Sequence, residues 1–380
     1  MNKLEELKMF ENVRIRGYRS LKDIELNDLR QFNLIIGKNN SGKTNLIEAL
    51  YQAINPGNAA LLGKIHLWKG LDVIDPEIWK TIFYKLDLSN RIEIISKIDN
   101  PSRERFLTIS PLLSSDLTSK EDFSQNQRKN HDIIKDSTSM EPDLIKGLSL
   151  QLYYIEDNKK SENYYSTIFT QNVEFDPVRD RGKTITVSPF SINNSDKYKC
   201  LSRGKIINSE TIYSDLWKRF KKIAIKKKKE DIITILREFD SNLIDLELIG
   251  NIIYVDLGYN EKMPIQIMGY GFLKTLALLT DIRNEENFII LIDEIENGLH
   301  HKNLKTMWSA IFKAALLMNN QIIATTHSFE CIRAFIESYP KSDDNLRVFR
   351  IEREKDDNYK VNKFNKEQVE LYLDNKWEIR

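Results

Sequence analysis

The segment GKNNSGKT, residues 37–44, limits what this chain can fold into more than any other stretch. It matches the pattern G-x-x-x-x-G-K-[ST] without a gap, and a compact apolar run at 32–36 leads straight into it. A helix is expected over 42–54, because the sequence Asn-Pro-Gly at 55–57 stops it. A strand, a glycine loop and a helix in this order are the context in which the pattern binds phosphate. The sequence therefore predicts an α/β fold of the P-loop NTPase class.

The residues of this loop have separate chemical parts in a nucleotide site. Gly37 and Gly42 let the backbone curl, so that successive N–H groups face an anion at a helix N-terminus. The Lys43 ammonium is expected to reach the β and γ phosphates of ATP, and the Thr44 hydroxyl can ligate Mg²⁺. The nucleotide-binding residues expected in this segment are Gly37, Lys38, Asn39, Asn40, Ser41, Gly42, Lys43, Thr44 and Asn45. The alternative is a chance match in a glycine-containing turn.

A second feature of the same kind is the acidic pair Asp293-Glu294 at the end of the apolar run 288–292. Open α/β sheets bind ligands at the carboxyl ends of their strands. Asp293 is therefore expected to hold Mg²⁺ through its coordination shell, and Glu294 to polarise the water that attacks the γ phosphate. The alternative is that the pair opens an ordinary surface turn.

A third polar group follows the next apolar run, in the sequence QIIATTHS at 321–328. The helical pattern at 304–319 separates the two runs, and strand, helix, strand indicates a parallel sheet. An imidazole at a strand end can hydrogen-bond the γ phosphate, so His327 is expected to sense it and to take part in catalysis. A lone histidine is otherwise more often a structural hydrogen bonder.

The order of these motifs resembles the ABC-type ATPases, and among them the OLD-like (overcoming lysogenization defect) group of SMC-related ATPases. GKNNSGKT resembles Walker A, LIDEIENGLHH resembles Walker B running into a D-loop, and ATTHS resembles the H-loop. The resemblance covers residues 10–55 and 265–335. It implies a P-loop head with a parallel-sheet core, an N-terminal antiparallel β part and a mixed, partly helical insertion. The head is expected at 1–100 and 250–380, and the insertion at 101–249.

The resemblance also assigns further residues to nucleotide binding. IRGYRS at 15–20 is similar to the first strand of SMC-like heads and suggests Arg19, or else Arg16. MGYGFLKT at 268–275 falls at the signature helix, where Gly269 and Gly271 would cap ATP held by the opposite subunit. The chain has Gly-Tyr-Gly where transporter ATPases have Ser-Gly-Gly. No glutamine of a Q-loop stands out between 55 and 100.

What the resemblance implies about activity is an ATPase that uses ATP and Mg²⁺. ATP would join two heads into a homodimer or higher homo-oligomer, with Glu296 and His300 near the seam. OLD-like proteins serve in anti-phage defence, and the larger ones carry a Toprim nuclease. Only about fifty residues follow His327, so we expect any such effector to be a separate protein.

Composition leaves the choice of partner open. The chain has 380 residues with 57 basic and 56 acidic side chains, so no global field steers it toward nucleic acid. The two cysteines, Cys200 and Cys331, form no disulfide framework, which fits a reducing, cytoplasmic location. No run is long and apolar enough for a bilayer, so no membrane contact is expected.

One local stretch, WKRFKKIAIKKKK at 217–229, carries eight Lys or Arg residues. Such a stretch gives salt-sensitive DNA binding or simply faces water, and the acidic residues that follow favour water. Two other functions therefore remain possible. One is a DNA-clamping repair or recombination ATPase, and the other is a scaffold held together by ATP with little turnover. The Gly-Tyr-Gly signature disfavours a transporter ATPase.

Overall fold

A parallel sheet forms the centre of the protein. The computed structural model describes residues 9–71, 75–98, 103–113, 145–156, 159–170, 190–194, 203–340 and 343–375. The strands of the central sheet lie in the order β10 (Gly204–Ile207), β14 (Ile289–Ile292), β15 (Gln321–Thr326), β3 (Phe32–Ile36), β16 (Leu346–Arg353) and β17 (Tyr359–Phe364). All pairs are parallel except β16 with β17. β3, β14 and β15 are buried throughout, as continuous apolar runs in parallel sheets are.

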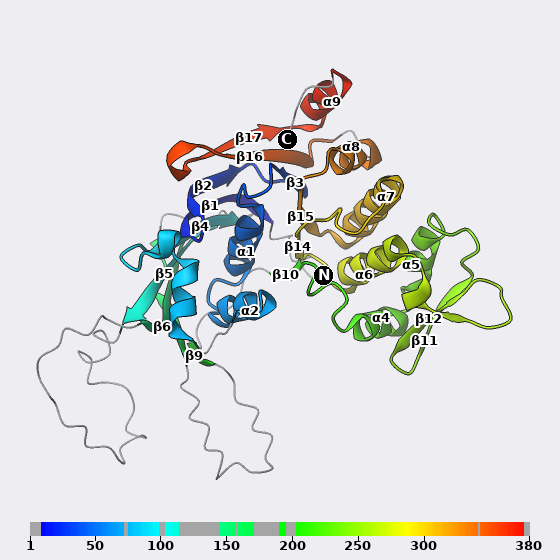
Figure 1. Ribbon diagram of the computed structural model, residues 1–380, viewed down its shortest axis with the longest axis horizontal. Coiled ribbons are helices and arrows are strands. Elements are labelled where there is room, and N and C mark those ends of the chain that lie inside the picture. Colours follow the sequence, from blue (N-terminus) through cyan, green and yellow to red (C-terminus); the bar gives the residue numbers. More distant parts are fainter. Residues whose placement is uncertain are drawn as a thin grey trace, which may run out of the picture.

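Helices cover both faces of this sheet (Figure 1). On one side lie α1 (Lys43–Ile54) and α2 (Ala60–Trp68), and on the other α6 (Tyr270–Asn284), α7 (His301–Met318) and α8 (Phe329–Ser338). Alternate residues of each strand enter different cores, because side chains alternate across a strand. Leu34 packs with the layer of α6 to α8, whereas Ile35 packs with α1. The predicted strand 32–36 and helix 42–54 are thus confirmed.

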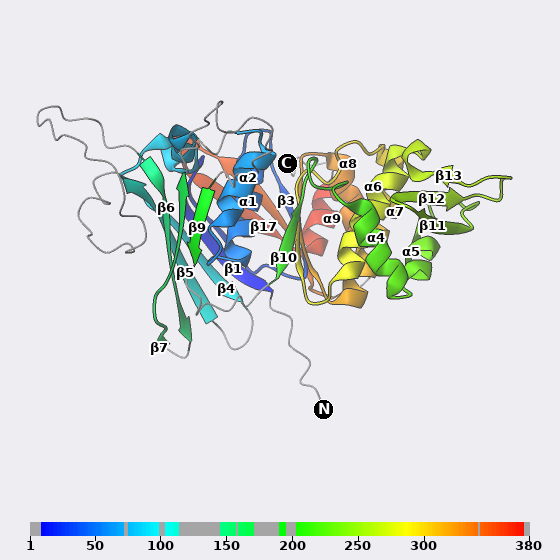
Figure 2. The ribbon, with the colours of Figure 1, turned by 90° about the horizontal axis from the view of Figure 1, so that it is seen from below.

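An antiparallel sheet packs against the α1 side of the molecule (Figure 2). Among the described residues it contains β1 (Phe10–Tyr18), β2 (Leu21–Asn27), β4 (Ile92–Ile98), β5 (Arg103–Leu113), β6 (Ile145–Glu156), β7 (Lys159–Lys160), β8 (Tyr164–Thr170) and β9 (Phe190–Asn194). The buried amide of Gln321 ties the two sheets together. It accepts from the Phe10 N–H at 2.9 Å and donates to the Phe10 carbonyl at 2.9 Å.

The sheet runs through the expected boundary at residue 100. β4 pairs with β5 along its whole length, from Ile92 opposite Ile109 to Ile98 opposite Arg103. The polar composition of residues 100–145 predicts a long loop or partial disorder, which is wrong for β5, and residues 114–144 lie outside the described residues. The alternation in β5 is masked because Arg105 occupies an inward position. Its guanidinium is buried and donates to the Ala53 carbonyl at 2.8 Å.

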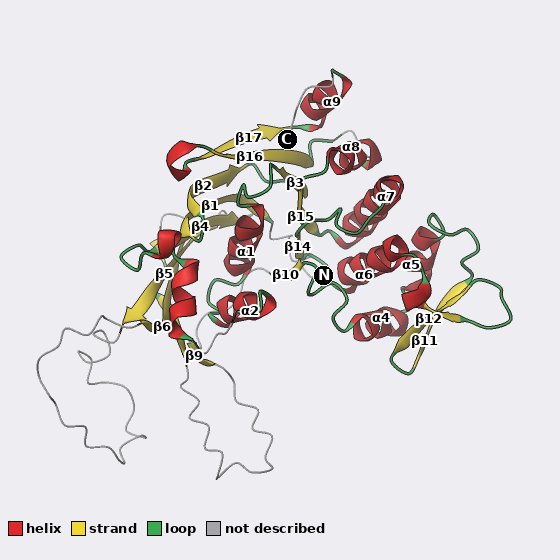
Figure 3. Cartoon of the chain, in the orientation of Figure 1, coloured by secondary structure: helices red, strands yellow, loops and turns green. Residues whose placement is uncertain are grey.

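The rest of the expected insertion adds helices to the α6 side (Figure 3). It contains α4 (Leu216–Ile225), α5 (Lys229–Leu236) and β11 (Asp245–Ile249). Across the expected boundary at residue 249, β11 pairs with β12 (Ile252–Asp256), and β12 pairs with β13 (Met263–Pro264). Asp281 on α6 anchors this layer through ion pairs with Lys205 of β10 and Arg219 of α4. Because β10 joins the central sheet, the segment 101–249 contributes to three parts of the molecule.

The C-terminal segment also belongs to the core. β16 pairs with β3 over five residues, and α9 (Lys366–Asp374) follows β17. Short 3₁₀ turns complete the described chain at Pro76–Ile82, Tyr84–Leu86, Ile265–Ile267 and Lys355–Asp357. Two acids of this segment form ion pairs: Asp357 pairs with Arg353, and Asp344 pairs with Arg347. No helix in the described ranges is long and apolar enough to cross a membrane.

His66 provides a pH test of the core behind α1. The ring is fully buried, and its Nδ1 lies 2.9 Å from the Leu62 carbonyl, which can only accept. Burial lowers the pKa of His66 to about 4. The unfolded chain takes up this proton near pH 6.5, before the folded chain does, so stability should fall as the pH drops from 6.5 to 4. The full loss is about 3 kcal/mol.

We therefore expect His66→Phe to flatten the pH dependence of urea unfolding between pH 4 and 6.5, relative to the unmodified protein. His301→Gln, which changes an exposed histidine, is the matched control and should leave the slope unchanged. Parallel slopes for the His66 variant and the unmodified protein would contradict the buried neutral imidazole.

Candidate nucleotide site

The glycine loop wraps around the side chain of Lys43 between β3 and α1. The Lys43 ammonium donates to the carbonyls of Gly37 at 2.7 Å and Lys38 at 2.9 Å. Gly42 has φ +86°, and an added Cβ would lie 2.9 Å from the Tyr359 hydroxyl, so only glycine fits. The backbone of this loop is thus arranged around a cation at the N-terminus of a 12-residue helix, which suits an anionic ligand.

The predicted carboxylates lie at the corresponding end of β14. The Thr325 hydroxyl donates to Asp293 Oδ1 at 2.6 Å and accepts from the Glu294 N–H at 2.8 Å. Glu294 is exposed and has φ +48°, an uncommon backbone conformation for a glutamate. Strand pairing between β14 and β15 therefore holds both acids in fixed positions.

The charges of nearby carboxylates act on Lys43 of the glycine loop. Burial lowers the pKa of Lys43, while Glu296, Asp293 and Glu294 act to raise it. The strands that lead to these residues also end at nearly the same level, because Ile292 pairs with Ala324 and Thr326 pairs with Ile36. The geometry therefore brings together the two motifs that are 250 residues apart in the sequence.

His327 follows β15 and is held by Glu296. The Glu296 carboxylate accepts from the His327 backbone N–H at 2.8 Å and lies 3.0 Å from its Nδ1. Glu296 is only 9% exposed, whereas the His327 side chain is 47% exposed. Glu296, expected near a dimer seam, is thus a buried partner of His327. His300 accepts from the Lys302 N–H and so caps α7.

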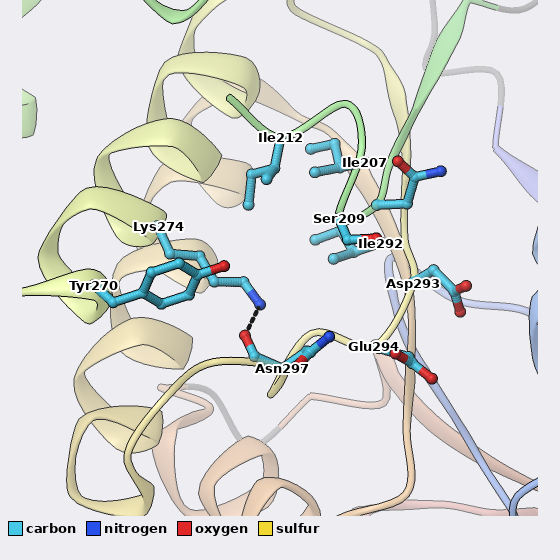
Figure 4. A pocket seen from close by; sticks show the side chains of 10 residues that line it. Ile207, Ser209, Ile212, Tyr270, Lys274, Ile292, Asp293, Glu294 and Asn297 are labelled. Carbon is cyan, nitrogen blue, oxygen red and sulfur yellow. Dashed lines mark hydrogen bonds between the residues drawn. The ribbon is translucent and has the colours of Figure 1, made fainter. Parts of the chain in front are cut away.

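A small cavity of about 40 Å³ lies behind the acids (Figure 4). Its lining residues come from β10 and the turn after it, from α6 and from the end of β14: Ile207, Asn208, Ser209, Ile212, Tyr270, Lys274, Ile292, Asp293, Glu294 and Asn297. The carboxylates of Asp293 and Glu294 point away from Tyr270 and Lys274. A wider cleft of about 510 Å³ opens on another side of the loop, between residues 38–41 and 350–353.

Sequence reasoning missed Asn208 and Ser209 in this site. They follow β10, which ends at Ile207. The Ile207 carbonyl accepts from the Asp293 N–H at 2.9 Å. The side-chain oxygen of Asn208 accepts from the Thr211 N–H at 2.9 Å and turns the chain toward α4. The only signal was a polar residue after the four-residue run GKII, which is too short to be recognised as a core strand.

The two glycines of the signature segment have different surroundings. Gly269 is exposed at the N-terminus of α6, and an added Cβ would meet nothing within 4 Å. Gly271 is buried, and an added Cβ would lie 2.9 Å from Asn303 Nδ2 on α7. Gly269 is therefore available to a neighbouring molecule, whereas Gly271 permits close packing of α6 on α7.

Arg19 and Asn45 contact side chains of their own subunit. Arg19 pairs with Glu48 at 2.9 Å, one turn along α1 from Thr44, and its side chain is only 10% exposed. The Asn45 amide donates to the Ser20 hydroxyl at 2.8 Å. Arg16 pairs with Asp23 and Glu93 on the antiparallel sheet. Arg19 and Asn45 thus join α1 to the turn between β1 and β2, whereas Arg16 links β1 to its neighbours β2 and β4.

The described residues could bind Mg²⁺ only together with the phosphates of a bound nucleotide. In the part of the chain that the structure describes, no group of three or more His, Cys, Asp or Glu residues could hold a metal ion by itself. Mg²⁺ usually keeps several waters and is bound through one or two carboxylates together with substrate phosphates. Asp293 and the Thr44 hydroxyl, near a loop that cradles phosphate, are consistent with that mode.

A P-loop sheet with an antiparallel sheet on one side, and a helical layer joined to it just before the carboxylate strand, is the architecture of an ABC-type ATPase head. The protein is an ATPase of this type. Residues 32–333 match the family model described as "AAA domain, putative AbiEii toxin, Type IV TA system". The match covers most of the chain, and the chain belongs to this family.

Two named proteins and one solved structure are similar to this chain. A Helicobacter pylori protein named ATP/GTP phosphatase is 25% identical over 338 residues, covering 85% of this chain and 86% of the relative. Endonuclease GajA of Bacillus cereus is 24% identical over 376 residues, covering 83% of this chain but only 54% of GajA. A solved Smc head domain bound to the C-terminal domain of ScpA, from Pyrococcus furiosus, has 13% identity and a TM-score of 0.47, covering 97% of this chain and 99% of that one.

The contact between Glu296 and His327 yields a prediction about turnover. If Glu296 acts only through His327, then Glu296→Ala, His327→Ala and the double variant should lower kcat by the same factor, about 10- to 100-fold. Steady-state ATP hydrolysis of the three variants measures this. Losses that multiply in the double variant would show that the two residues act independently.

Proposed function

We propose that this protein hydrolyses ATP between two copies of its head, and that the resulting association controls a separate effector in anti-phage defence. The observation that carries the proposal is that β3, β14 and β15, which lead to the loop of Lys43, to Asp293-Glu294 and to His327, end at one edge of the sheet, where Glu296 holds His327. This arrangement supplies a phosphate cradle, a magnesium ligand, a base for water and a sensor.

Each residue has one part in the proposed reaction. Lys43 exchanges its contacts with the Gly37 and Lys38 carbonyls for the β and γ phosphates. Thr44 and Asp293 hold Mg²⁺, which neutralises charge on the phosphate oxygens. Glu294 orients and polarises the attacking water, and His327 donates to the γ phosphate from an imidazole positioned by Glu296. We propose that Asn208, which lines the same cavity as Asp293, helps to orient that water.

The second head enters the proposal through Gly269. Its backbone is exposed at the start of a 15-residue helix, where N–H groups and the helix dipole favour an anion. We propose that this end caps ATP bound to the loop of another copy, as in related heads. The likeness to the ABC type and the exposure of Gly269 support a homodimer.

Defence and the effector are supported by the relatives. The family description names a toxin of toxin–antitoxin systems, and GajA is named an endonuclease. The match to this chain covers 54% of GajA. We propose that the effector controlled by the heads is a Toprim-type nuclease. ATP-dependent joining and separation of the heads would switch that partner on or off.

Direct DNA clamping is less well supported, because much of the basic stretch is neutralised within the protein. Acid partners within the fold are Asp215 for Lys218, Asp281 for Arg219, Glu286 for Lys228 and Asp245 for Lys229. Lys226 donates to the Asn284 carbonyl. These contacts attach α4 and α5 to neighbouring elements. Phosphate binding would have to break several of them.

Two variants test the proposed site. Lys43→Ala should weaken MgATP binding at least about 100-fold, because the buried ammonium that contacts the phosphates is lost.

Glu294→Gln should bind MgATP normally, lose at least about 100-fold in turnover and accumulate as a dimer on size exclusion with MgATP. Fluorescent-nucleotide titration, phosphate release and light scattering measure these quantities.

Lys221→Ala, at an exposed position of α4, is the control and should behave as the unmodified protein. Normal affinity in Lys43→Ala would contradict the phosphate loop. Normal turnover in Glu294→Gln would contradict its role with water. Tight binding with no turnover in any form would instead support a scaffold held together by ATP.

A further inference from the structure

Two side chains of α6, Lys274 and Tyr270, contact the turn formed by residues 294–298. The Lys274 ammonium donates to the carbonyls of Ile295 at 2.8 Å and Asn297 at 2.7 Å. One helical turn earlier, the Tyr270 ring lies over Gly298, where an added Cβ would come within 2.2 Å of the ring. Residues i and i+4 share one face of a helix. Figure 4 shows both side chains lying side by side against this turn.

The turn at residues 294–298 carries two residues that are proposed to act in ATP hydrolysis. Glu294 begins it with φ +48°, and Gly298 ends it with φ +73°. Glu296, in its middle, accepts from the His327 N–H at 2.8 Å. Displacing this turn would therefore move the glutamate that faces water and release the support of the histidine.

The energetics of Lys274 favour a fixed contact. Its side chain is buried, with 5% exposed, and burial lowers the pKa of Lys274 to about 8. The group therefore still carries its charge at neutral pH. A buried ammonium is costly unless it is hydrogen-bonded, so the two carbonyls and the nearby Glu296 and Glu294 are what retain it. A methionine would fill the space but leave both carbonyls without a donor.

We propose that Lys274 and Tyr270 are positioning residues that couple the exposed N-terminus of α6 to the turn carrying Glu294 and Glu296. A ligand or second head that engages Gly269 then shifts this turn together with the helix. The inference rests on the proposed function, because it assigns a cause to the activation of the same site. It also gives Tyr270, the residue that departs from Ser-Gly-Gly, a defined contact.

Lys274→Met and Lys274→Arg provide the direct test, with Lys221→Met as the control on an exposed lysine. We expect Lys274→Met to keep its affinity for MgATP within about threefold and to lose about 100-fold in kcat, because small misplacements of a catalytic group have effects of that size. Lys274→Arg, which keeps the charge and the donors, should recover at least tenfold of this loss. Tyr270→Ala should show a partial loss of the same kind.

A second readout does not depend on hydrolysis. Hydrogen exchange of the amides in 294–299 should accelerate at least about tenfold in Lys274→Met, while those in 37–46 remain unchanged. If Lys274→Met had the turnover of the unmodified protein and unchanged hydrogen exchange in 294–299, the inference would be overturned. Equal losses of affinity, melting temperature and turnover would overturn it as well, since they indicate a purely structural lysine. If the proposed function itself is wrong, Glu294→Gln will hydrolyse ATP as fast as the unmodified protein, which separates that failure from a failure of this inference.

Discussion

The structure depends above all on the parallel register of β14, β15 and β3. Ile292 pairs with Ala324, and Thr326 pairs with Ile36, so the three strands end at nearly the same level. The segments that leave those ends carry Asp293, His327 and the glycine loop. Apolar burial on both faces fixes this register, because a slip of one residue would turn each strand's side chains to the wrong core. The chemistry of the site is thus set by packing within the sheet.

Around this core, a few buried polar contacts join elements that are distant in sequence. Thr325 bridges Asp293 and Glu294, Glu296 holds His327, and Gln321 ties the central sheet to β1. Removing one partner of such a contact costs more than the contact contributes, since the other group is left buried without a partner. These contacts therefore tie the turn after β14 to the end of β15, and the end of β1 to the start of β15.

Much of this core could be predicted because strong local signals coincide there. The run at 32–36, the loop and the helix after it have the expected bounds, and the ABC-type fold class is confirmed. The assignment of individual site residues remains a prediction. For most of them the structure agrees on proximity, whereas Arg19 and Gly271 have partners within their own subunit.

What could not be predicted lacks a local signal. β5 carries an inward arginine whose partners are Ser96 and the Ala53 carbonyl, and nothing nearby in sequence reveals them. β10 has four residues, and its place beside β14 depends on pairing over more than 80 positions. β16 ends in Arg350-Ile351-Glu352-Arg353, which is typical of a surface strand, although the first four residues of β16 are buried. The positions of Asn208 and Lys274 follow from these long-range pairings.

The central claim is that ATP is hydrolysed at a site shared by two heads. The most direct test is phosphate release by the unmodified protein over a hundredfold range of its own concentration, at saturating MgATP. The account predicts that the rate per head rises with concentration and levels off once the heads are paired, in step with dimer formation measured by light scattering. A rate per head that stays constant while the protein remains monomeric would show that one head is sufficient, and would contradict the account.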